Sequence, residues 1–385
     1  MADSRALRRA AAIVGAAETA RVDVQPDRSE LSLHSEAALA ALADAGLTPA
    51  DVDGLATAGP RPSQIAEYLG IVPRWVDGTS IGGCSFLAHV GHAAAAIASG
   101  YASVVLITHG ESGRSRVGVE RRVPSPATPW GQFEMPYGVF GPPTMFALPV
   151  VRHMARFGST EEQFAAVAVA TRRWAQLNPK ATMHDPLTVE DVLASRLVAW
   201  PLHLLNCCLV TDAGGALVVV AGDRARDFPR PPVWLLGRGE AVAHQNVSQM
   251  RDLAVSEAYR VAGEEAFRMA GVGPADIDHA MLYDAFTHTP VYMLEALGFV
   301  RSGEGGPFFA EMRTAPGGEL PINTNGGGLS YTHTGMYGMF AILESVAQLR
   351  GDAGARQVEG VELSLAHGAG GMFAAGATLI LTNQG

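Results

Sequence analysis

The chain repeats one sequence pattern, and this repeat limits the folds that it can adopt. The segment AGLTPADVDGLAT occupies residues 45–57, and AGVGPADIDHAML occupies residues 270–282. Alanine, glycine, proline and two aspartates recur in both at one offset (270 − 45 = 225). An alanine-rich amphipathic helix is expected before each segment, ended by glycine and followed by a proline-initiated turn. The 385 residues are therefore expected to contain two copies of one unit.

The elements that surround the two segments also recur. GHAAAAIASGYASVVLITHG, in the first half, predicts a helix, a glycine stop and a buried strand. MYGMFAILESVAQLRG and VEGVELSLAHG, in the second half, predict the same order. Helices that alternate with apolar strands indicate a layered α/β fold.

A stretch between the copies differs from both. It is rich in proline, methionine, arginine and tryptophan, and its helical part is expected to begin with Ser159 as N-cap. We expect this stretch to cover an active site or to form an oligomer contact. The predicted boundaries are 1–112 with 206–225 for the first half, 113–205 for the inserted loop and helical region, and 226–385 for the second half.

Composition excludes several classes of protein. The net charge is −10 (28 − 38) and no long basic run occurs, which argues against a nucleic-acid partner. Cys84, Cys207 and Cys208 are too few for a disulfide framework and fit a reducing cytoplasm. Adjacent cysteines without a histidine cluster make a poor metal site. No apolar run is long enough to cross a bilayer, so we expect a cytoplasmic protein without metal or membrane contact.

Several segments, taken in chain order, resemble landmarks of the thiolase superfamily. They are CSFLAHVGHAAAAIASGYASVVLITHGES, TDAGGALVVV, LYDAFTH and NTNGGGLSYTHTG. The resemblance covers nearly the whole chain. It implies a duplicated five-layer αβαβα fold with an inserted loop and helical region, a homodimeric core, an acyl-CoA substrate and no separate cofactor.

More narrowly, the chain resembles the sterol-carrier or lipid-transfer branch of this superfamily. That branch includes bacterial enzymes that cut steroid side chains by retro-aldol chemistry. Such enzymes commonly work with a small partner protein that carries an OB-fold and a zinc ribbon. The resemblance therefore implies a partner of this kind, which nothing in the spacing of this chain shows.

The cysteines are the main departure from the thiolase pattern. A thiolase has a nucleophilic cysteine at the start of a first-half helix, whose N-terminus lowers the thiol pKa. An ungapped match places Gly83 there, with Cys84 one residue away, so Cys84 is either a displaced nucleophile or a packed thiol. The second thiolase cysteine would fall on Ala366 or His367, and no cysteine follows Cys208.

The other two landmarks supply polar side chains. LYDAFTH provides Tyr283 and Asp284, in the Tyr-Asp-x-Phe pattern of the steroid aldolases that this chain resembles. A tyrosine bonded to backbone at a strand end is the alternative reading. NTNGGGLSYTHTG places His333 on the catalytic histidine of thiolases, near two further phenols. The remaining candidates in and after this turn are Asn325, Gly326, Gly327, Gly328, Tyr331 and Tyr337.

These residues predict an aldolase acting on a β-hydroxyacyl-CoA, because retro-aldol cleavage needs no covalent acyl-enzyme. Tyr283 and Tyr331 would form the acid and base pair, and His333 would be an oxyanion donor or proton partner. The basic phenol would need a pKa shifted from its usual ~10. The glycine turn would approach the ligand and offer N–H groups. The alternatives are an acyltransferase that uses Cys84 and a non-catalytic acyl-CoA carrier.

Contacts with the CoA phosphates are a separate question. Arginines suit phosphate recognition, but a solvated charged face is the alternative reading. The candidates lie in the inserted region: Arg114, Arg116, Arg121 and Arg122.

Overall fold

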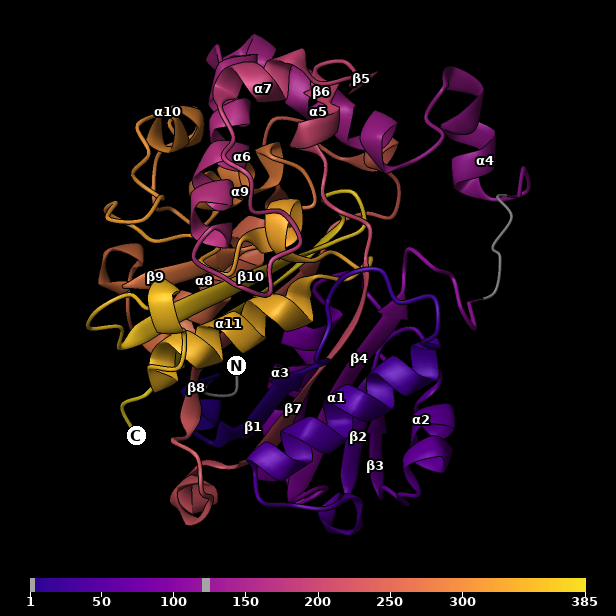
Figure 1. Ribbon diagram of the computed structural model, residues 1–385, viewed down its shortest axis with the longest axis vertical. Coiled ribbons are helices and arrows are strands. Elements are labelled where there is room, and N and C mark those ends of the chain that lie inside the picture. Colours follow the sequence, from indigo (N-terminus) through magenta and orange to yellow (C-terminus); the bar gives the residue numbers. More distant parts are fainter. Residues whose placement is uncertain (1–3, 120–124) are drawn as a thin grey trace.

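The two repeats join edge to edge in one nine-stranded sheet, in a computed structural model that describes residues 4–119 and 125–385 (Figure 1). The strand order is β3-β2-β4-β7-β1-β8-β11-β10-β9, and β5 pairs separately with β6. The strands are β1 Ala11–Glu18, β2 Gly54–Thr57, β3 Trp75–Asp77, β4 Val104–Ser112, β5 Leu197–Ala199, β6 Leu202–His203, β7 Asp212–Ala221, β8 Val233–Val242, β9 His279–Leu282, β10 Leu363–Gly370 and β11 Ala375–Thr382.

The α-helices cover this sheet and form a separate cap at one end of the molecule (Figure 1). They are α1 Glu30–Asp44, α2 Pro62–Leu69, α3 Ser85–Ala98, α4 Pro129–Phe133, α5 Pro142–Phe157, α6 Glu161–Ala175, α7 Val189–Ala194, α8 Glu257–Ala270, α9 His288–Ala296, α10 Gly305–Ala310 and α11 Gly338–Arg350.

The predicted duplication is present in the order of elements. The first copy runs β1, α1, β2, α3, β4, β7, and the second runs β8, α8, β9, α11, β10, β11. Neighbouring strands read β2-β4-β7-β1 in one copy and β9-β10-β11-β8 in the other. The repeated Pro-Ala-Asp forms the short 3₁₀ turns Pro49–Asp51 and Pro274–Asp276 before β2 and β9. The copies meet where β1 pairs antiparallel with β8.

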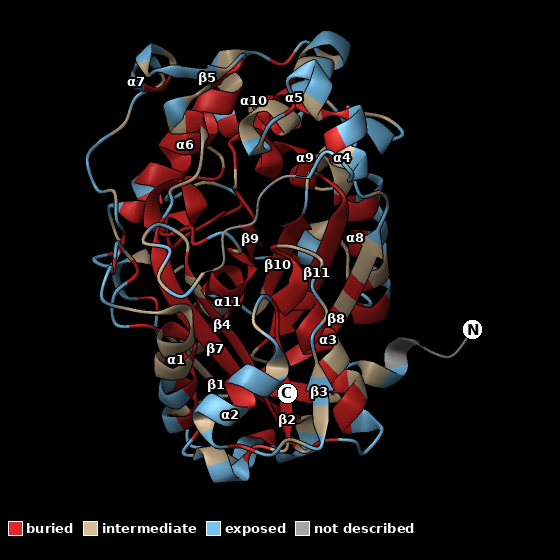
Figure 2. Cartoon of the chain, turned by 90° about the vertical axis from the view of Figure 1, so that its right-hand side faces the viewer, coloured by how far each residue is buried: buried red, intermediate tan, exposed pale blue. Residues whose placement is uncertain are grey.

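Three helical layers and the two halves of the sheet together make five layers. Helix α1 packs on β1, β4 and β7, and α8 packs on β8 and β11, so these two helices form the outer layers. Helices α3 and α11 touch each other and strands of both copies, and they form the middle layer. Helix α3 can lie there because its sequence, SFLAHVGHAAAAIA, is small and apolar nearly all round. Figure 2 shows the buried strands at the centre and the exposed α2 at the edge.

The cap comes from the segment between β4 and β7, which contains helices α4 to α7. Helix α6 begins one residue later than expected, because Thr160 is its N-cap and accepts a hydrogen bond from the Gln163 N–H. The Ser159 hydroxyl instead bonds to His153 Nδ1 at 2.9 Å, so the N-cap prediction was wrong by one residue. The exact domain boundaries stay a prediction.

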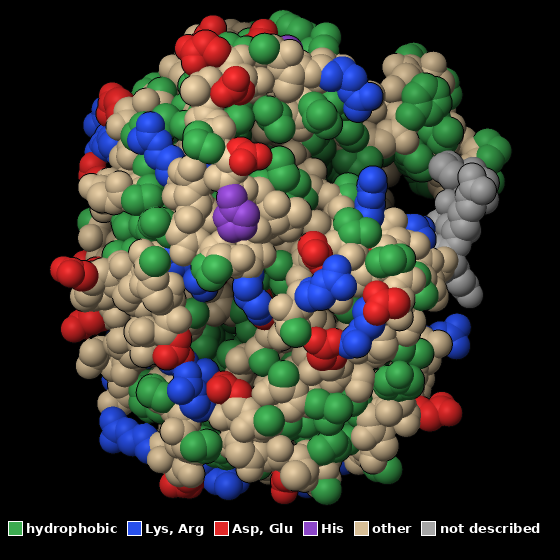
Figure 3. Space-filling view, viewed as in Figure 1, with side chains coloured by type: hydrophobic (Ala, Val, Ile, Leu, Met, Phe, Trp, Pro, Cys, Tyr) green, Lys and Arg blue, Asp and Glu red, His purple; other side chains and the backbone are tan. Residues whose placement is uncertain are grey.

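Charged side chains of both signs are interspersed over the face shown in Figure 3, with no single basic patch on it. In the described ranges, no helix is long and apolar enough to cross a membrane.

His92 ties the middle layer to both copies. Its Nδ1 lies 2.7 Å from Asp77 Oδ2 on β3, and its Nε2 lies 3.0 Å from Glu240 Oε1 on β8. The hydrogen bonds with Asp77 and Glu240 raise the pKa of His92 to about 9. The neighbouring charged and titratable groups are Arg238, which contacts Glu240, and His89, whose pKa burial lowers to about 4.

A folded-state pKa above 6.5 means that the protonated His92 stabilises the fold below pH 6.5, and that this stabilisation is lost as the pH rises through about 9. We expect His92→Gln to lower Tm by about 2–4 °C near pH ~6 and by much less near pH ~10. Thermal unfolding of both proteins at the two pH values measures this. An equal loss at both values would contradict the ion-pair account.

Candidate active site

Tyr283 follows β9 directly, and its hydroxyl meets three groups from one stretch of the second copy. The oxygen lies 2.9 Å from His333 Nε2 and 3.1 Å from the Gly335 carbonyl, which can accept a hydrogen bond from the hydroxyl. The Tyr337 N–H donates to the same oxygen at 3.1 Å. Strand β9 is buried along its whole length, so the phenol starts from a fixed backbone.

Burial sets the protonation of this pair. It raises the pKa of Tyr283 well above 10, against the opposing effect of the Tyr337 N–H. It lowers the pKa of His333 to about 4. At neutral pH the pair is therefore a neutral phenol beside a neutral imidazole, one able to give a proton and the other to take it. A basic tyrosine would require a lowered phenol pKa, whereas the pKa of Tyr283 is raised.

Asp284 holds the glycine turn in place. Its carboxylate accepts hydrogen bonds from the N–H groups of Gly328 at 2.6 Å and Leu329 at 3.3 Å. A side chain at Gly327 would overlap this carboxylate, and Gly327 has a positive φ of 60° in a π-helical turn, Gly327–Tyr331. Burial raises the pKa of Asp284 to about 7.

The glycine N–H groups are bonded within the protein. Gly326 donates to the Asn323 carbonyl at 2.9 Å, and Gly327 donates to Asn325 Oδ1 at 2.8 Å. Gly328 donates to Asp284. In the structure these N–H groups are therefore not available to a ligand, contrary to the expectation from the sequence. The turn instead fixes the backbone that leads to His333.

The other two phenols of the turn do not join Tyr283 through their hydroxyls. The Tyr331 hydroxyl donates to Glu18 Oε2 at 2.5 Å and lines a different cavity. The Tyr337 hydroxyl donates to Asn325 Oδ1 at 2.7 Å, although its backbone N–H reaches Tyr283. The expected pairing of Tyr283 with Tyr331 is therefore not present.

The Tyr283 ring fills the space beside Gly83. A Cβ atom added at Gly83 would overlap Tyr283 Cε1. Cys84, the N-cap of α3, is fully buried, and its Sγ lies 3.4 Å from the Ile81 carbonyl. Burial raises the pKa of the Cys84 thiol to about 12. Cys84 does not line the pocket that Tyr283 faces, and this placement fits a packed thiol.

A largely apolar cavity of about 590 Å³ opens beside Tyr283 and His333. The cap contributes Phe146, and the second copy contributes Phe286 and Met372. Polar catalytic candidates thus line a space that suits a bulky apolar group. His367 does not line it, because its Nδ1 bonds to Thr378 Oγ1 at 2.7 Å on the adjacent strand.

Known proteins are similar to this chain over most of its length. Residues 239–383 match the family described as Thiolase C-terminal domain-like. The chain is 38% identical over 360 residues to the steroid side-chain-cleaving aldolase of Thermomonospora curvata, covering 89% of this chain and 90% of that protein. The chain belongs to the thiolase superfamily.

Two further members of this superfamily are similar over nearly their whole length. The 17-hydroxy-3-oxo-4-pregnene-20-carboxyl-CoA lyase of Mycobacterium tuberculosis is 39% identical over 372 residues, covering 91% of this chain and 94% of the lyase. The solved structure described as "Ltp2-ChsH2(DUF35) aldolase" has a TM-score of 0.90 at 35% identity, covering 98% of both chains. The predicted thiolase fold is confirmed.

Sequence reasoning missed Glu111 in this thiolase-fold site. This residue ends the run ITHGE on β4, and burial raises its carboxyl pKa to about 7. A side chain at Gly335 would overlap the Glu111 carboxyl group, so Glu111 supports the turn whose carbonyl contacts Tyr283. An acidic residue at the end of a buried strand was the available signal.

Metal and phosphate contacts are less defined. Within residues 4–119 and 125–385, no group of three or more His, Cys, Asp or Glu side chains could hold a metal ion. Arg114 and Arg116 are exposed and do not line the cavity beside Tyr283. Arg121 and Arg122 lie outside the described residues.

The tight fit of Gly83 against Tyr283 is testable. We expect Gly83→Ala to lower turnover at least about 100-fold, because the added methyl displaces the phenol from His333 and Gly335. Gly141→Ala is the matched control, since its φ is −177° and a Cβ there meets nothing within 4 Å. Steady-state kinetics of both variants measure the effect, and unaltered turnover in Gly83→Ala would contradict the placement of Tyr283.

Proposed function

We propose that this chain is a carbon–carbon lyase of thiolase fold, an aldolase that cleaves the Cα–Cβ bond of a β-hydroxyacyl-CoA. The products are a ketone and a shortened acyl-CoA. One observation carries the proposal: the Tyr283 ring fills the space beside Gly83, the residue that the ungapped match places at the thiolase nucleophile. The names of the related aldolase and lyase support it.

The neutral pair of Tyr283 and His333 suits both proton transfers of this reaction. The substrate β-hydroxyl gives its proton to the Tyr283 oxygen as Tyr283 gives its own to His333 Nε2, which lies 2.9 Å away. The Cα–Cβ bond then breaks, and its electrons enter the thioester as an enolate. The proton returns through Tyr283 to the α-carbon. Protons and electrons balance without an oxidant, without free CoA and without a lasting phenolate.

A steroid side chain or a similar bulky group is the proposed substrate portion. The apolar cavity of about 590 Å³ supports this choice, because Tyr283 and His333 line it together with mainly apolar side chains. The substrate names carried by the related aldolase and lyase point the same way. The CoA thioester itself is substrate, and no separate cofactor is proposed.

The proposed assembly has a homodimeric core and a small partner with an OB-fold and a zinc ribbon. The description of the solved relative, an Ltp2–ChsH2(DUF35) aldolase, supports such a partner. The exposed aromatic side chains Phe133, Tyr137 and Phe140 on the arm around α4 support a protein-binding surface in the cap. A cytoplasmic location is proposed from the cysteine content.

Single-turnover cleavage of a steroid β-hydroxyacyl-CoA by the protein with its partner tests the proposal. We expect Tyr283→Phe to lose at least about 100-fold in rate, because the phenol carries both proton transfers. Tyr331→Phe makes the same chemical change outside the cavity and should keep the rate. Cys84→Ala should also keep the rate, without added CoA.

Two results would point to other functions. An inactive Cys84→Ala whose parent requires free CoA would make the chain an acyltransferase with a displaced nucleophile. Tight thioester binding with no cleavage, in the presence of the partner, would make it a carrier. Either result would overturn the aldolase proposal.

A further inference from the structure

A buried aromatic cluster behind the wall of the catalytic cavity contains polar atoms with no protein partner. The unpartnered atoms are the Tyr259 hydroxyl, both ring nitrogens of His288, and His367 Nε2. All three side chains are 0% exposed. Buried polar atoms are nearly always hydrogen-bonded, so a group of four unpartnered atoms in one cluster points to a missing partner.

Phe373 lies at the centre of this cluster. Its ring centroid is 5.7 Å from those of Tyr259 and His288, and Tyr259 is 4.8 Å from His367. On the other side, Phe373 is 5.3 Å from Phe146, which lines the catalytic cavity. His288 lies directly behind the cavity wall, with its ring centroid 5.3 Å from that of Phe146, while Phe373 lies between Phe146 and Tyr259.

Phe373 has an unfavourable backbone conformation. It is fully buried, yet its φ is +59°, in the turn that joins β10 to β11. Bulky side chains rarely adopt this region, and such strain persists only where surrounding contacts hold it. Burial of the ring offsets the strain. Opening of the turn releases this strain, and it is favoured when another apolar group takes the place of the Phe373 ring.

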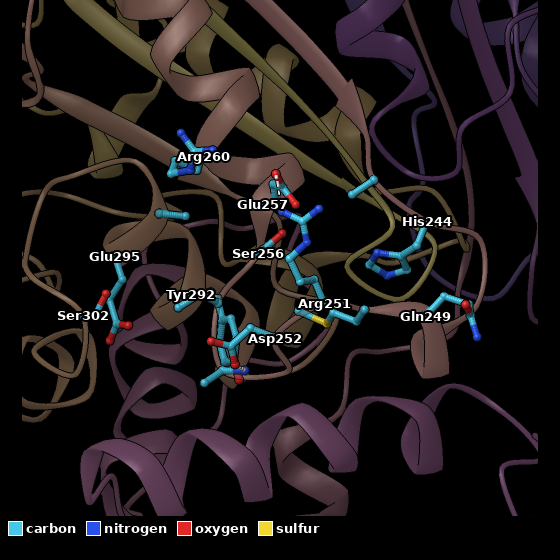
Figure 4. A pocket seen from close by; sticks show the side chains of 15 residues that line it. His244, Gln249, Arg251, Asp252, Ser256, Glu257, Arg260, Tyr292, Glu295 and Ser302 are labelled. Atoms are coloured by element: carbon cyan, nitrogen blue, oxygen red, sulfur yellow. Dashed lines mark hydrogen bonds and ion pairs between the residues drawn. The ribbon is translucent and has the colours of Figure 1, made fainter.

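A second cavity, of about 460 Å³, lies on the surface side of the cluster (Figure 4). Tyr292 lines it, and its ring is 4.7 Å from Phe373. The Tyr292 hydroxyl is held by the carbonyls of Pro149 and Leu253 at 2.8 and 2.9 Å, so this side of the cluster is fixed. His244, also in this cavity, bonds to the Met372 carbonyl at 3.1 Å beside Phe373.

The surface cavity does not suit an apolar ring system. Its labelled side chains in Figure 4 include Arg251, Asp252, Glu257 and Glu295. The catalytic cavity, beyond Phe146 and Phe373, is therefore the apolar space next to the cluster.

We propose that Phe373 gates an extension of the catalytic cavity, and that Tyr259, His288 and His367 form its polar end. This end binds a ketone or hydroxyl at the far end of a rigid apolar substrate. The inference rests on the proposed function, since it assigns the recognition of the distal part of the same substrate.

The chemistry of the three side chains selects a neutral oxygen group. A neutral imidazole has one donor and one acceptor nitrogen, and a phenol can do both. Burial lowers the pKa of His288 well below its usual value and lowers that of His367 to about 3, so neither is a cation at neutral pH. The cluster offers no permanent positive charge, and a carboxylate would therefore be buried without a counter-ion.

The test is equilibrium binding of two CoA thioesters in a Tyr283→Phe background, which prevents turnover. Both thioesters carry the same tetracyclic ring system, and one has a ketone at the end remote from the thioester. We expect Tyr259→Phe to lower the preference for the ketone about 3- to 10-fold, because one hydrogen bond is lost. Tyr292→Phe makes the same change in the same cluster and should leave the preference unaltered, since its hydroxyl is already held by backbone.

Two further measurements address the gate and the fold. Phe373→Gly removes both the ring and the strain at φ +59°, so it should speed association of the ketone thioester in stopped-flow binding. Tyr259→Phe should keep the Tm of the free protein, because the deleted hydroxyl has no protein partner. A Tm loss of several degrees would give that hydroxyl a structural role and overturn the subsite.

The outcomes separate this inference from the proposed function. If both thioesters bind and the ketone preference is the same in Tyr259→Phe and in His288→Leu, the subsite is overturned and the aldolase proposal stands. If neither thioester binds to the folded protein, the proposed substrate class is wrong, and the subsite is wrong with it. An unaltered association rate in Phe373→Gly would overturn the gate.

Discussion

The site depends on how the Tyr283 phenol is held. Its ring lies against Gly83 at the start of a first-copy helix, while its hydroxyl contacts His333 and the Gly335 carbonyl of the second copy. A side chain at position 83 and the phenol cannot occupy the same space. Glycine at this position therefore leaves the space that the phenol occupies.

The turn that carries His333 is stabilised by groups that do not reach the cavity. Asp284 and Asn325 accept the N–H groups of consecutive glycines, and Glu111 packs behind Gly335. Burial raises the carboxyl pKa of Asp284 and of Glu111 to about 7, so desolvation outweighs the bonds that these groups receive. The same burial keeps His333 and Tyr283 neutral. Hydrogen bonds to Asp284 and Asn325 thus hold the turn, while burial sets the protonation of Tyr283 and His333.

The cavity combines polar and apolar lining. Tyr283 and His333 are polar groups in its wall, while Phe146, Phe286 and Met372 provide apolar surface. The cap and the turn after β10 form part of the wall and carry neither Tyr283 nor His333, whereas Phe286 lies three residues from Tyr283. Different substrates can therefore be recognised by changes in these segments without disturbing the hydrogen bonds of Tyr283.

The sequence by itself determined the repeated unit, because proline, glycine and hydrophobic period act locally and recur at one offset. The two repeated turns, before β2 and β9, are present as predicted. It also identified Tyr283 and His333, which lie at recognisable motifs. It did not separate Tyr283 from Tyr331, because the π-helical turn between Gly327 and Tyr331 directs the Tyr331 phenol toward Glu18. Only the tertiary structure brought Gly83 against Tyr283 and buried Cys84, since these contacts join segments about 200 residues apart (283 − 83) whose spacing follows from the packing of α3 against both copies.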